Sequence, residues 1–451
     1  MRDLMNDAAM RAMTYLAGVD ERHVGPTDAA IARLSALEYS LPDGPTDPQA
    51  VIAELDDHAD ALTAVGNPRF FGFVIGATLP AALAASWLAN AWDQNAGLYT
   101  ISPLTATLEV VALRWLVDAL GLPSETGAGF VTGATMANFT ALCAARHAVL
   151  ERAGWDVERD GMFGAPAVTV IVGAEAHPTL FKSLGLAGFG RGRVVRVPVD
   201  NQGRMRADAF PDITGPTIVC LQAGNVNTGA FDPAAQIIPR AHAAGAWVHV
   251  DGAFGLWAAA SPKYRHLMAG YAEGDSWATD AHKYLNTPYD SGLAFVRDAA
   301  TLRAAMAITA AYLPTSEHRE PSDFTPELSR RARGVEVWAA LRSLGRSGIA
   351  ELVDRTCQCA QQFAEGMRHA GFAVINEVVL NQVLVQFGTP EQTRAIIAAI
   401  QADGTLWAGP TIWQGQTAMR ISISSWKTTA ADIDRAIAVT LRIAQTQMGT
   451  A

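Results

Sequence analysis

Short runs of apolar, β-branched residues recur between residues 67 and 298 and indicate buried strands. The runs are Val168–Val172, Val194–Val197, Thr217–Leu221, Trp247–Val250 and Leu293–Val296. Helical patterns lie between several of them, as in Asn138–Arg152 and Ala234–Ala244. Continuous apolar strands that alternate with helices are typical of a mostly parallel sheet covered on both faces. Such a sheet binds ligands at the carboxyl ends of its strands.

The pattern changes towards both ends of the chain. Residues 1–63 alternate short amphipathic stretches with Pro and Gly breaks, which predicts a helical arm. After Arg330, helical patterns and two strand-like runs indicate a smaller α+β region. Its helices are expected at 334–344, 349–369, 391–402 and 429–446, and its strands at 379–387 and 420–424. We therefore expect an arm (1–63), a large α/β domain (64–325) and a small C-terminal α+β domain (326–451).

Composition narrows the class of protein. Of 451 residues, 50% are hydrophobic and 17% are charged, which is enough apolar material for a large buried core. The net charge of -10 and the lack of Lys/Arg runs argue against a nucleic-acid partner. The four cysteines have no zinc-ligand spacing, so we expect no metal and reduced thiols in a cytoplasmic protein. The first residues do not resemble a signal peptide, and Phe70–Trp92 is expected to be buried rather than to span a membrane.

Two charged residues mark candidate chemistry. Asp251 directly follows the strand Trp247–Val250, where a buried carboxylate would need a cationic partner such as a pyridinium nitrogen. Lys283 lies 32 residues later in a mostly apolar stretch beside His282, so it is a candidate for a lowered pKa and imine formation. Taken alone, Asp251 is more often a turn or helix-cap residue, and a lone lysine such as Lys283 is usually a solvated surface residue.

Two further segments fit a phosphorylated ligand. Small residues in Gly129–Asn138 lead into a helix, whose N-terminal N–H groups favour an anion. The candidates there are Thr132, Gly133, Ala134 and Thr135. His177 follows the strand Val168–Val172 and could stack on a cofactor ring, although a lone His at this place is more often a hydrogen-bonded loop residue.

In this order, the segments resemble the pyridoxal 5'-phosphate (PLP)-dependent group II amino-acid decarboxylases, which include the aromatic-amino-acid and glutamate decarboxylases. His249–Gly255 is similar to the family's "HVDAAYGG" and Asp280–Lys283 to its "NPHK". Further similar stretches are Asn67–Phe73, Ile101–Pro103 with Glu109, Gly129–Asn138, His177, Ser329–Arg331 with Trp338, and Arg420. The resemblance covers nearly the whole chain after the arm. It implies the PLP-dependent transferase-like fold (fold type I), with a seven-stranded-type sheet flanked by helices.

The resemblance also implies roles for single residues. Lys283 carries PLP as a Schiff base, Asp251 holds the pyridinium nitrogen, and His177 and Ala253 cover the two ring faces. Asp280 and His282 lie near the phosphate. Where the family has "AGTT", this chain has Ala223-Gly224-Asn225-Val226, so Asn225 is expected to donate to the ring oxygen in place of Thr. Phe71, Phe73, Ser102, Pro103 and Arg420 are the expected substrate-binding residues.

Tyr312 bears on the reaction. Ala311-Tyr312-Leu313 resembles the loop in which decarboxylases carry a Tyr that donates a proton after CO2 leaves, whereas aldehyde-forming relatives carry Phe. We therefore expect an L-amino-acid decarboxylase with an aromatic substrate preferred. A carbon–carbon lyase, an aldehyde-forming enzyme and a PLP-binding protein without turnover remain the alternatives. The resemblance further implies a homodimer with active sites at the subunit interface, and the arm suits a swapped interface element.

Overall fold

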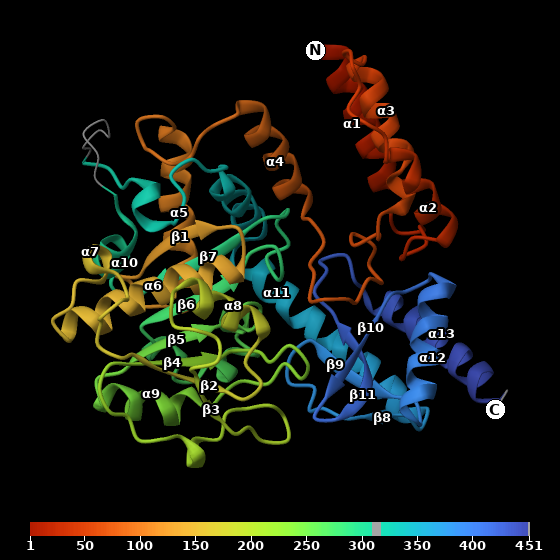
Figure 1. Ribbon diagram of the computed structural model, residues 1–451. Coiled ribbons are helices and arrows are strands. Elements are labelled where there is room, and N and C mark those ends of the chain that lie inside the picture. The colour runs from red at the N-terminus through yellow and green to blue at the C-terminus, as the bar shows by residue number, and fades with distance from the viewer. Residues whose placement is uncertain (309–316, 450–451) are drawn as a thin grey trace. The chain divides into compact units, whose positions relative to one another are not determined.

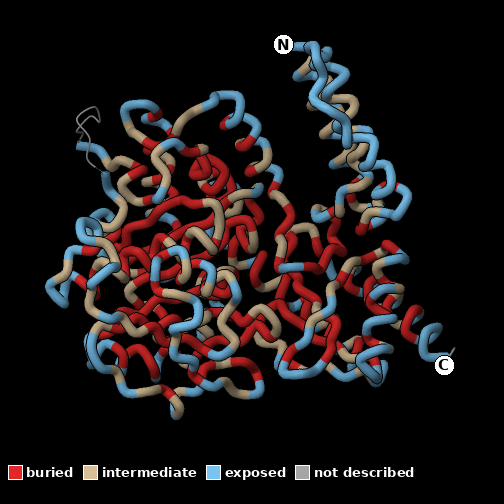
Figure 2. The backbone as a smooth tube through the Cα atoms, in the orientation of Figure 1, coloured by how far each residue is buried: buried red, intermediate tan, exposed pale blue. Residues whose placement is uncertain are grey.

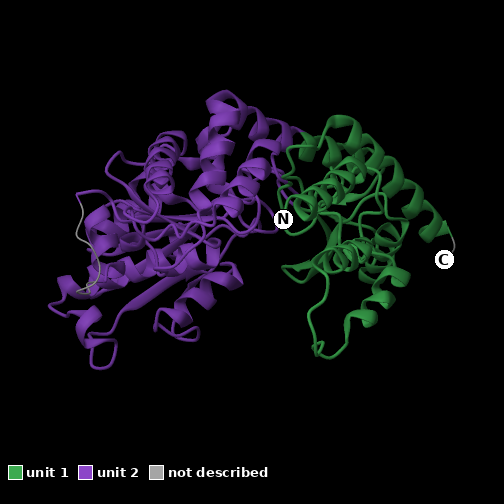
Figure 3. Ribbon diagram, turned by 90° about the horizontal axis from the view of Figure 1, so that it is seen from above, with its two compact units in different colours: residues 1–77, 359–375, 383–451 green, residues 78–358, 376–382 purple. Residues whose placement is uncertain are grey.

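The structure, a computed structural model, describes residues 1–308 and 317–449. It divides into two compact units (Figure 3). Unit 1 comprises residues 1–77, 359–375 and 383–451, and unit 2 comprises residues 78–358 and 376–382. This division follows spatial contact rather than chain order, so the expected division into three consecutive domains stays a prediction.

Unit 2 is built on a seven-stranded sheet with the order β1-β7-β6-β5-β4-β2-β3 (Figure 1). Its strands are β1 Gly127–Val131, β2 Thr169–Gly173, β3 Val195–Val197, β4 Thr217–Gln222, β5 Trp247–Asp251, β6 Ser276–Asp280 and β7 Gly292–Val296. Pairing is parallel from β3 through β6, and β7 runs antiparallel to both β6 and β1. The predicted mostly parallel sheet is therefore confirmed. Two of its strands, β1 and β6, were not among the predicted runs.

Helices cover the sheet of unit 2, and its strands are buried except β3, where Val195 and Arg196 are exposed (Figure 2). The α-helices are α4 Pro80–Trp92, α5 Pro103–Ala119, α6 Ala134–Arg152, α7 Val157–Asp160, α8 Pro178–Leu186, α9 Ala234–Ala243 and α10 Ala299–Met306. Short 3-10 helices are η3 Ala207–Ala209, η4 Gly255–Ala260, η5 Arg265–Met268, η6 Tyr271–Glu273 and η7 Pro321–Phe324. Helix α6 packs against β1, β4, β5, β6 and β7, so one helix contacts most strands of the sheet.

A long helix, α11 Arg333–His369, begins in unit 2, and its residues after Gln358 belong to unit 1. Its backbone leaves helical geometry at Gly345, where φ is 60°. A positive φ favours glycine because it has no Cβ. The two predicted helices, 334–344 and 349–369, are thus the two halves of α11 on either side of this kink.

Unit 1 holds the N-terminal arm and the C-terminal elements. The arm consists of α1 Arg2–Gly18, α2 Asp28–Arg33, η1 Leu34–Leu37, α3 Pro48–Asp57 and η2 Ala59–Ala61. A four-stranded sheet has the order β10-β11-β9-β8, with β8 Ala373–Val374, β9 Gln382–Gln386, β10 Gly409–Trp413 and β11 Gln416–Ser422. Helices α12 Pro390–Asp403 and α13 Ala430–Gly449 pack against each other. The segment before Thr63 is thus helical, and helices and strands alternate after Phe372, while the assignment of an arm and of a separate C-terminal domain stays a prediction.

Helix α1 has no buried residue, although it packs against α3 (Figure 2). Large apolar side chains of the arm therefore face solvent in the single chain, among them Met5, Met13, Leu41 and Leu55. Within the described residues, no helix has both the length and the apolar character needed to cross a membrane.

Candidate active site

The candidate site lies at one edge of the sheet in unit 2. Strands β1, β2, β4, β5 and β6 run in one direction, so their carboxyl ends meet at this edge. His177 follows β2, Asn225 follows β4, Asp251 ends β5, and Asp280 ends β6. A small cavity there is lined by residues from three of these strand ends, among them His177, Gln222 and Asp251. The topology thus brings together residues that are far apart in the sequence.

The N-terminus of α6 forms one end of the site. The Ala134 amide donates to Asp280 Oδ1 at 2.6 Å. A Cβ at Gly292 would lie 2.4 Å from Gly133 Cα, so β7 passes this turn at a distance that only glycine allows. Thr132 and Thr135 are half-buried in the same turn. The predicted anion-binding site is therefore a tight turn. The first N–H of α6 in this turn already donates a hydrogen bond to a carboxylate.

Lys283 and His282 lie beside this turn. Lys283 Nζ is 2.9 Å from Asp280 Oδ2, and the lysine side chain is 19% exposed, so an incoming ligand can reach the amine. His282 Nδ1 accepts a hydrogen bond from the Ser291 amide at 3.1 Å, and Nε2 is 3.5 Å from Asp280 Oδ1. Burial lowers the pKa of His282, while the charge of Asp280 opposes this shift. The Tyr289 ring packs against the imidazole, with centroids 4.3 Å apart.

Asp251 is a buried carboxylate at the end of β5. The Ala253 amide donates to its Oδ1 at 3.3 Å, and Asn138 Nδ2 donates to its Oδ2 at 3.2 Å. Burial raises the pKa of Asp251, and the nearby His177 and Lys283 partly oppose that shift. No Lys, Arg or His side chain forms an ion pair with Asp251 in the part of the chain that the structure describes. The carboxylate therefore has neutral hydrogen-bond donors and lacks a cation in direct contact.

His177 and Asn225 approach the same edge from β2 and β4. His177 Nδ1 is 2.7 Å from Thr179 Oγ1 and accepts from the Thr179 amide at 3.3 Å, which caps α8 and fixes the ring. Asn225 Oδ1 accepts from the Asn227 amide at 2.8 Å, and its Nδ2 donates to Glu175 Oε2 at 3.3 Å. The amide that was expected to reach a ring oxygen thus has Glu175 as a partner in this structure.

The predicted substrate-binding residues are divided between the two units. Ser102 and Pro103 begin α5 in unit 2. Phe71, Phe73 and Arg420 belong to unit 1, where Phe71 is fully buried and Phe73 stacks on Trp407. Burial lowers the pKa of Arg420 on β11. Tyr312 lies outside the described residues. The substrate-binding role of these residues stays a prediction.

Two segments that the sequence placed in the same family pattern do meet. Arg330 Nη2 lies 2.5 Å from Glu109 Oε1 of α5, and both side chains are buried. Arg330 also donates to the carbonyls of Ala96 and Phe130. This buried pair therefore connects the segment that follows η7 to α5 and β1.

Sequence reasoning missed the side chains that support Asp251. Asn138 was noted only as the last residue of the segment Gly129–Asn138, and His249 only as the first residue of the segment His249–Gly255. His249 and Asp251 are two residues apart on a strand, so they point to the same face, and that spacing was the available signal. The partners on α6 and β6 gave no comparable signal.

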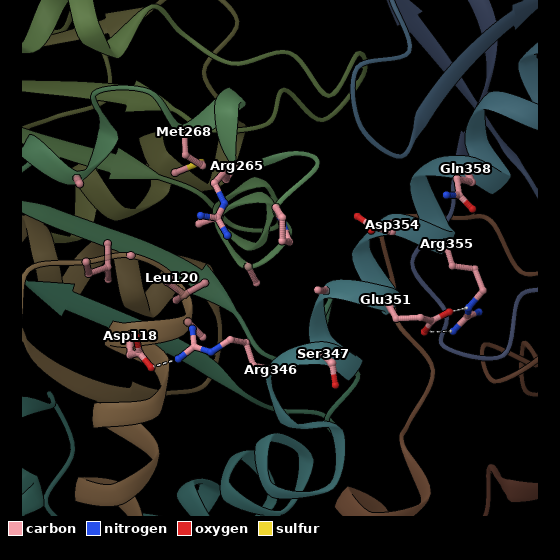
Figure 4. A pocket seen from close by; sticks show the side chains of 18 residues that line it. Asp118, Leu120, Arg265, Met268, Arg346, Ser347, Glu351, Asp354, Arg355 and Gln358 are labelled. Atoms are coloured by element: carbon pink, nitrogen blue, oxygen red, sulfur yellow. Dashed lines mark hydrogen bonds and ion pairs between the residues drawn. The ribbon is translucent and has the colours of Figure 1, made fainter.

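A second hollow in unit 2, of about 1100 Å³, lies between the end of α5, the η4–η5 segment and the second half of α11 (Figure 4). Its charged side chains include two ion pairs, Asp118–Arg346 and Glu351–Arg355. None of the residues from the four candidate segments lines it. The candidate residues therefore favour the smaller cavity, at the strand ends, as the active site.

A partly buried amine, a buried carboxylate without an ion-pair partner among the described residues and a helix N-terminus lie at one sheet edge, which is typical of the class of enzymes that work with PLP. Residues 32–388 match the family described as "Pyridoxal-dependent decarboxylase conserved domain". The chain belongs to this family, so it is a PLP-dependent carboxy-lyase.

Comparison with individual proteins agrees with this assignment. The chain is 28% identical over 406 residues to tryptophan decarboxylase 1 of Oryza sativa subsp. japonica, covering 81% of this chain and 78% of the relative. It is 27% identical over 377 residues to the aromatic-L-amino-acid decarboxylase of Bacillus atrophaeus, covering 80% and 76%. The crystal structure of Oryza sativa TDC with PLP and tryptamine superposes with a TM-score of 0.90 at 24% identity, covering 99% and 98% of the two chains. At this identity the superposition shows the shared fold.

The residues present fit PLP. Asp251 offers a buried anion to the ring nitrogen, and Lys283 offers an amine. The turn at Gly133 offers helix N–H groups to the phosphate, as in other anion-binding helix starts. One group does not fit a bound phosphate. The Asp280 carboxylate accepts the hydrogen bond from the Ala134 N–H, which a phosphate oxygen would otherwise accept.

We predict that His249 makes the fold sensitive to acid. Burial lowers the pKa of His249 to about 3, whereas an unfolded histidine titrates near 6.5. Between these values the unfolded chain binds a proton that the folded protein does not, so stability falls as the pH falls through this range. From pH 7 to pH 5, this contribution is about 2 kcal/mol.

Urea unfolding of the cofactor-free protein at both pH values measures the effect. The variant His249→Gln should lose about 2 kcal/mol less than the wild type on this change of pH. His266→Gln, at an exposed histidine of η5, should behave like the wild type. An identical pH dependence in the wild type and His249→Gln would contradict the prediction.

Proposed function

We propose that this enzyme decarboxylates an L-amino acid to its amine and CO2, with an aromatic amino acid as the preferred substrate. The observation that carries the proposal is the buried Asp251 carboxylate, which has no ion-pair partner among the described residues and lies at the same sheet edge as Lys283. The preference for an aromatic substrate is supported by two relatives, a tryptophan decarboxylase and an aromatic-L-amino-acid decarboxylase.

Each residue then has a distinct task. The Lys283 amine would hold the cofactor through its aldehyde carbon. Asp251 would accept the ring N–H, His177 would cover one face of the ring, and the turn from Thr132 to Thr135 would bind the phosphate with His282. When bound, PLP serves as an electron sink for the electrons left by the departing carboxylate. Tyr312 then supplies the proton to Cα.

The first test is a substrate panel on the PLP-loaded enzyme. We expect CO2 and amine from L-tryptophan, L-tyrosine or L-phenylalanine, and at least tenfold lower kcat/KM for L-glutamate, L-aspartate and L-2,4-diaminobutyrate. After borohydride reduction, mass spectrometry should find the cofactor on Lys283. Lys283→Ala should lose both the adduct and the activity, whereas Lys263→Ala, at an exposed lysine, should keep both.

The other outcomes identify the alternatives. Aldehyde and hydrogen peroxide, with oxygen consumed, would indicate the oxidative reaction in place of simple decarboxylation. A reducible adduct without product from any substrate would indicate a binding protein. An adduct that persists in Lys283→Ala would refute the lysine assignment.

Asp280 generates a second prediction. Its carboxylate receives the Ala134 N–H and pairs with Lys283. The bound phosphate would meet a like charge there, which opposes its binding. Asn at this position, as in the family's "NPHK", would keep an acceptor for Ala134 and remove the charge. We therefore expect Asp280→Asn to bind PLP about tenfold more tightly, which corresponds to about 1.4 kcal/mol.

Equilibrium titration of the cofactor-free protein with PLP measures this change. Asp298→Asn is the matched control, because it removes one charge at the N-cap of α10 and leaves a capping side chain. Weaker PLP binding in Asp280→Asn, with the control unchanged, would show that the carboxylate assists cofactor binding.

We also propose that the enzyme is a homodimer with active sites at the subunit interface, held in part by the N-terminal arm. The support is the arm itself, since α1 buries none of its residues within the single chain and Leu55 on α3 is 70% exposed. Exposed apolar side chains of this extent are typical of a surface that a partner covers.

Removing residues 1–63 should therefore convert the dimer to a monomer and weaken PLP retention. Leu55→Asp should shift the equilibrium in the same direction, whereas Phe163→Asp, at a 98% exposed loop residue outside the arm, should not. Analytical ultracentrifugation and cofactor absorbance measure the two effects. A truncated protein that remains dimeric with full cofactor would exclude this role of the arm.

A further inference from the structure

A chain of buried polar side chains leads across the sheet to Asp251. Trp247 Nε1 lies 2.9 Å from Ser276 Oγ, and Ser276 Oγ lies 2.9 Å from His249 Nδ1. His249 Nε2 lies 2.8 Å from Asn138 Oδ1, and Asn138 Nδ2 lies 3.2 Å from Asp251 Oδ2. All five residues are at most 5% exposed. They come from β5, β6 and α6, and the roles assigned above use only Asp251.

The chemistry of the groups fixes the direction of this chain. An indole N–H can only donate, so Ser276 Oγ accepts from Trp247 and keeps its own proton available for His249 Nδ1. The Asn138 amide that donates to Asp251 leaves its oxygen for His249, which selects this direction. His249 then carries its proton on Nε2 and donates to Asn138 Oδ1. The Asn138 amide donates to Asp251. Every hydrogen bond therefore points its donor towards the carboxylate.

The opposite direction is inconsistent with the carboxylate. If His249 carried its proton on Nδ1, its bare Nε2 would require the Asn138 amide nitrogen, which would turn the Asn138 oxygen towards Asp251. Two acceptors would then face each other in a buried place, which costs the desolvation energy of both. The neutral state of His249 agrees with the inferred direction, because burial keeps the imidazole unprotonated at neutral pH.

The proton on the cofactor ring has two possible positions in such a site. It lies either on the ring nitrogen, as an ion pair with the Asp251 carboxylate, or on the carboxyl, next to a neutral ring. Hydrogen bonds to an anion are stronger than those to a neutral acid, and aligned hydrogen bonds in a low-dielectric interior strengthen one another. Donors that point at Asp251 therefore favour the ionic arrangement, in which the ring withdraws electrons best.

We propose that Trp247, Ser276, His249 and Asn138 act as positioning residues that hold the shared proton on the cofactor's ring nitrogen through Asp251. The proposal rests on the proposed function, because it requires that Asp251 binds that nitrogen. A purely structural role would instead use the same hydrogen bonds to attach α6 to β5 and β6, with no effect on the proton.

The test uses the PLP-loaded enzyme with a ¹⁵N label at the ring nitrogen. The ¹⁵N chemical shift reports directly whether this nitrogen is protonated. His249→Leu interrupts the chain, whereas His249→Gln keeps an amide N–H for Asn138. We expect a protonated ring in the wild type and in His249→Gln, and a shift towards the unprotonated position in His249→Leu. The proton equilibrium should change about tenfold, as for the loss of a hydrogen bond to a charged group.

Two further variants control for folding. Ser276→Ala removes the link to Trp247 and should move the ring signal in the same direction, so it serves if His249→Leu does not fold. Thr140→Val removes a buried hydroxyl of α6 that donates only to its own helix, and should leave the ¹⁵N shift unchanged. Thermal denaturation and cofactor dissociation are measured in parallel for each variant.

The outcomes separate the two proposals. If folded, PLP-loaded His249→Leu and Ser276→Ala keep the wild-type ¹⁵N shift, the positioning role is refuted and the proposed function stands. A neutral ring in the wild type also refutes the positioning role. If the wild type forms no adduct at Lys283, the proposed function fails first and the inference fails with it.

Discussion

The site depends on one electrostatic constraint, which is a carboxylate buried at the end of a central strand without an ion-pair partner among the described residues. Asp251 has hydrogen bonds from Asn138 and Ala253, and these are neutral donors. Neutral donors cannot supply the opposite charge that a buried anion requires, and burial accordingly raises the pKa of Asp251. The fold thus provides an anion whose counter-ion must come from a ligand, and a protonated ring nitrogen meets that requirement.

A second carboxylate, Asp280, lies at the other end of the site and, unlike Asp251, has an ion-pair partner within the chain. It pairs with Lys283 and receives the first N–H of α6, so its charge is compensated within the chain. The two acids lie at the ends of neighbouring parallel strands, and their different partners give them different tasks. Asp251 attracts a cationic group. At the other end, the Ala134 N–H must leave the Asp280 carboxylate before it can donate to a phosphate. We expect this asymmetry to give the cofactor one orientation.

The sequence predicted the parts of the fold whose signal is local. Strands such as β4 and β5 are continuous apolar runs, whereas β1 (Gly-Ala-Gly-Phe-Val) and β6 (Ser-Trp-Ala-Thr-Asp) were missed because glycine and polar residues lower their apparent strand propensity. At Gly129 this composition has a packing reason, since a Cβ would lie 2.1 Å from the Phe324 carbonyl oxygen. Asp251 was predictable because it directly follows an apolar run, and Lys283 because it lies beside a histidine in a mostly apolar stretch. The partners of Asp251 were not, because a side chain on α6 and another on β6 meet only after the sheet has formed.

The buried polar chain behind Asp251 also connects folding with cofactor binding. Its members lie on α6, β5 and β6, so the geometry that fixes the carboxylate is the packing of one helix on two strands. A ligand that binds only the folded state stabilises that state by mass action. A cation that compensates Asp251 removes the main electrostatic cost of this packing, and the empty protein must retain that cost or protonate the carboxylate. Cofactor affinity and the stability of unit 2 therefore depend on the same few hydrogen bonds, and a change that disturbs one must disturb the other.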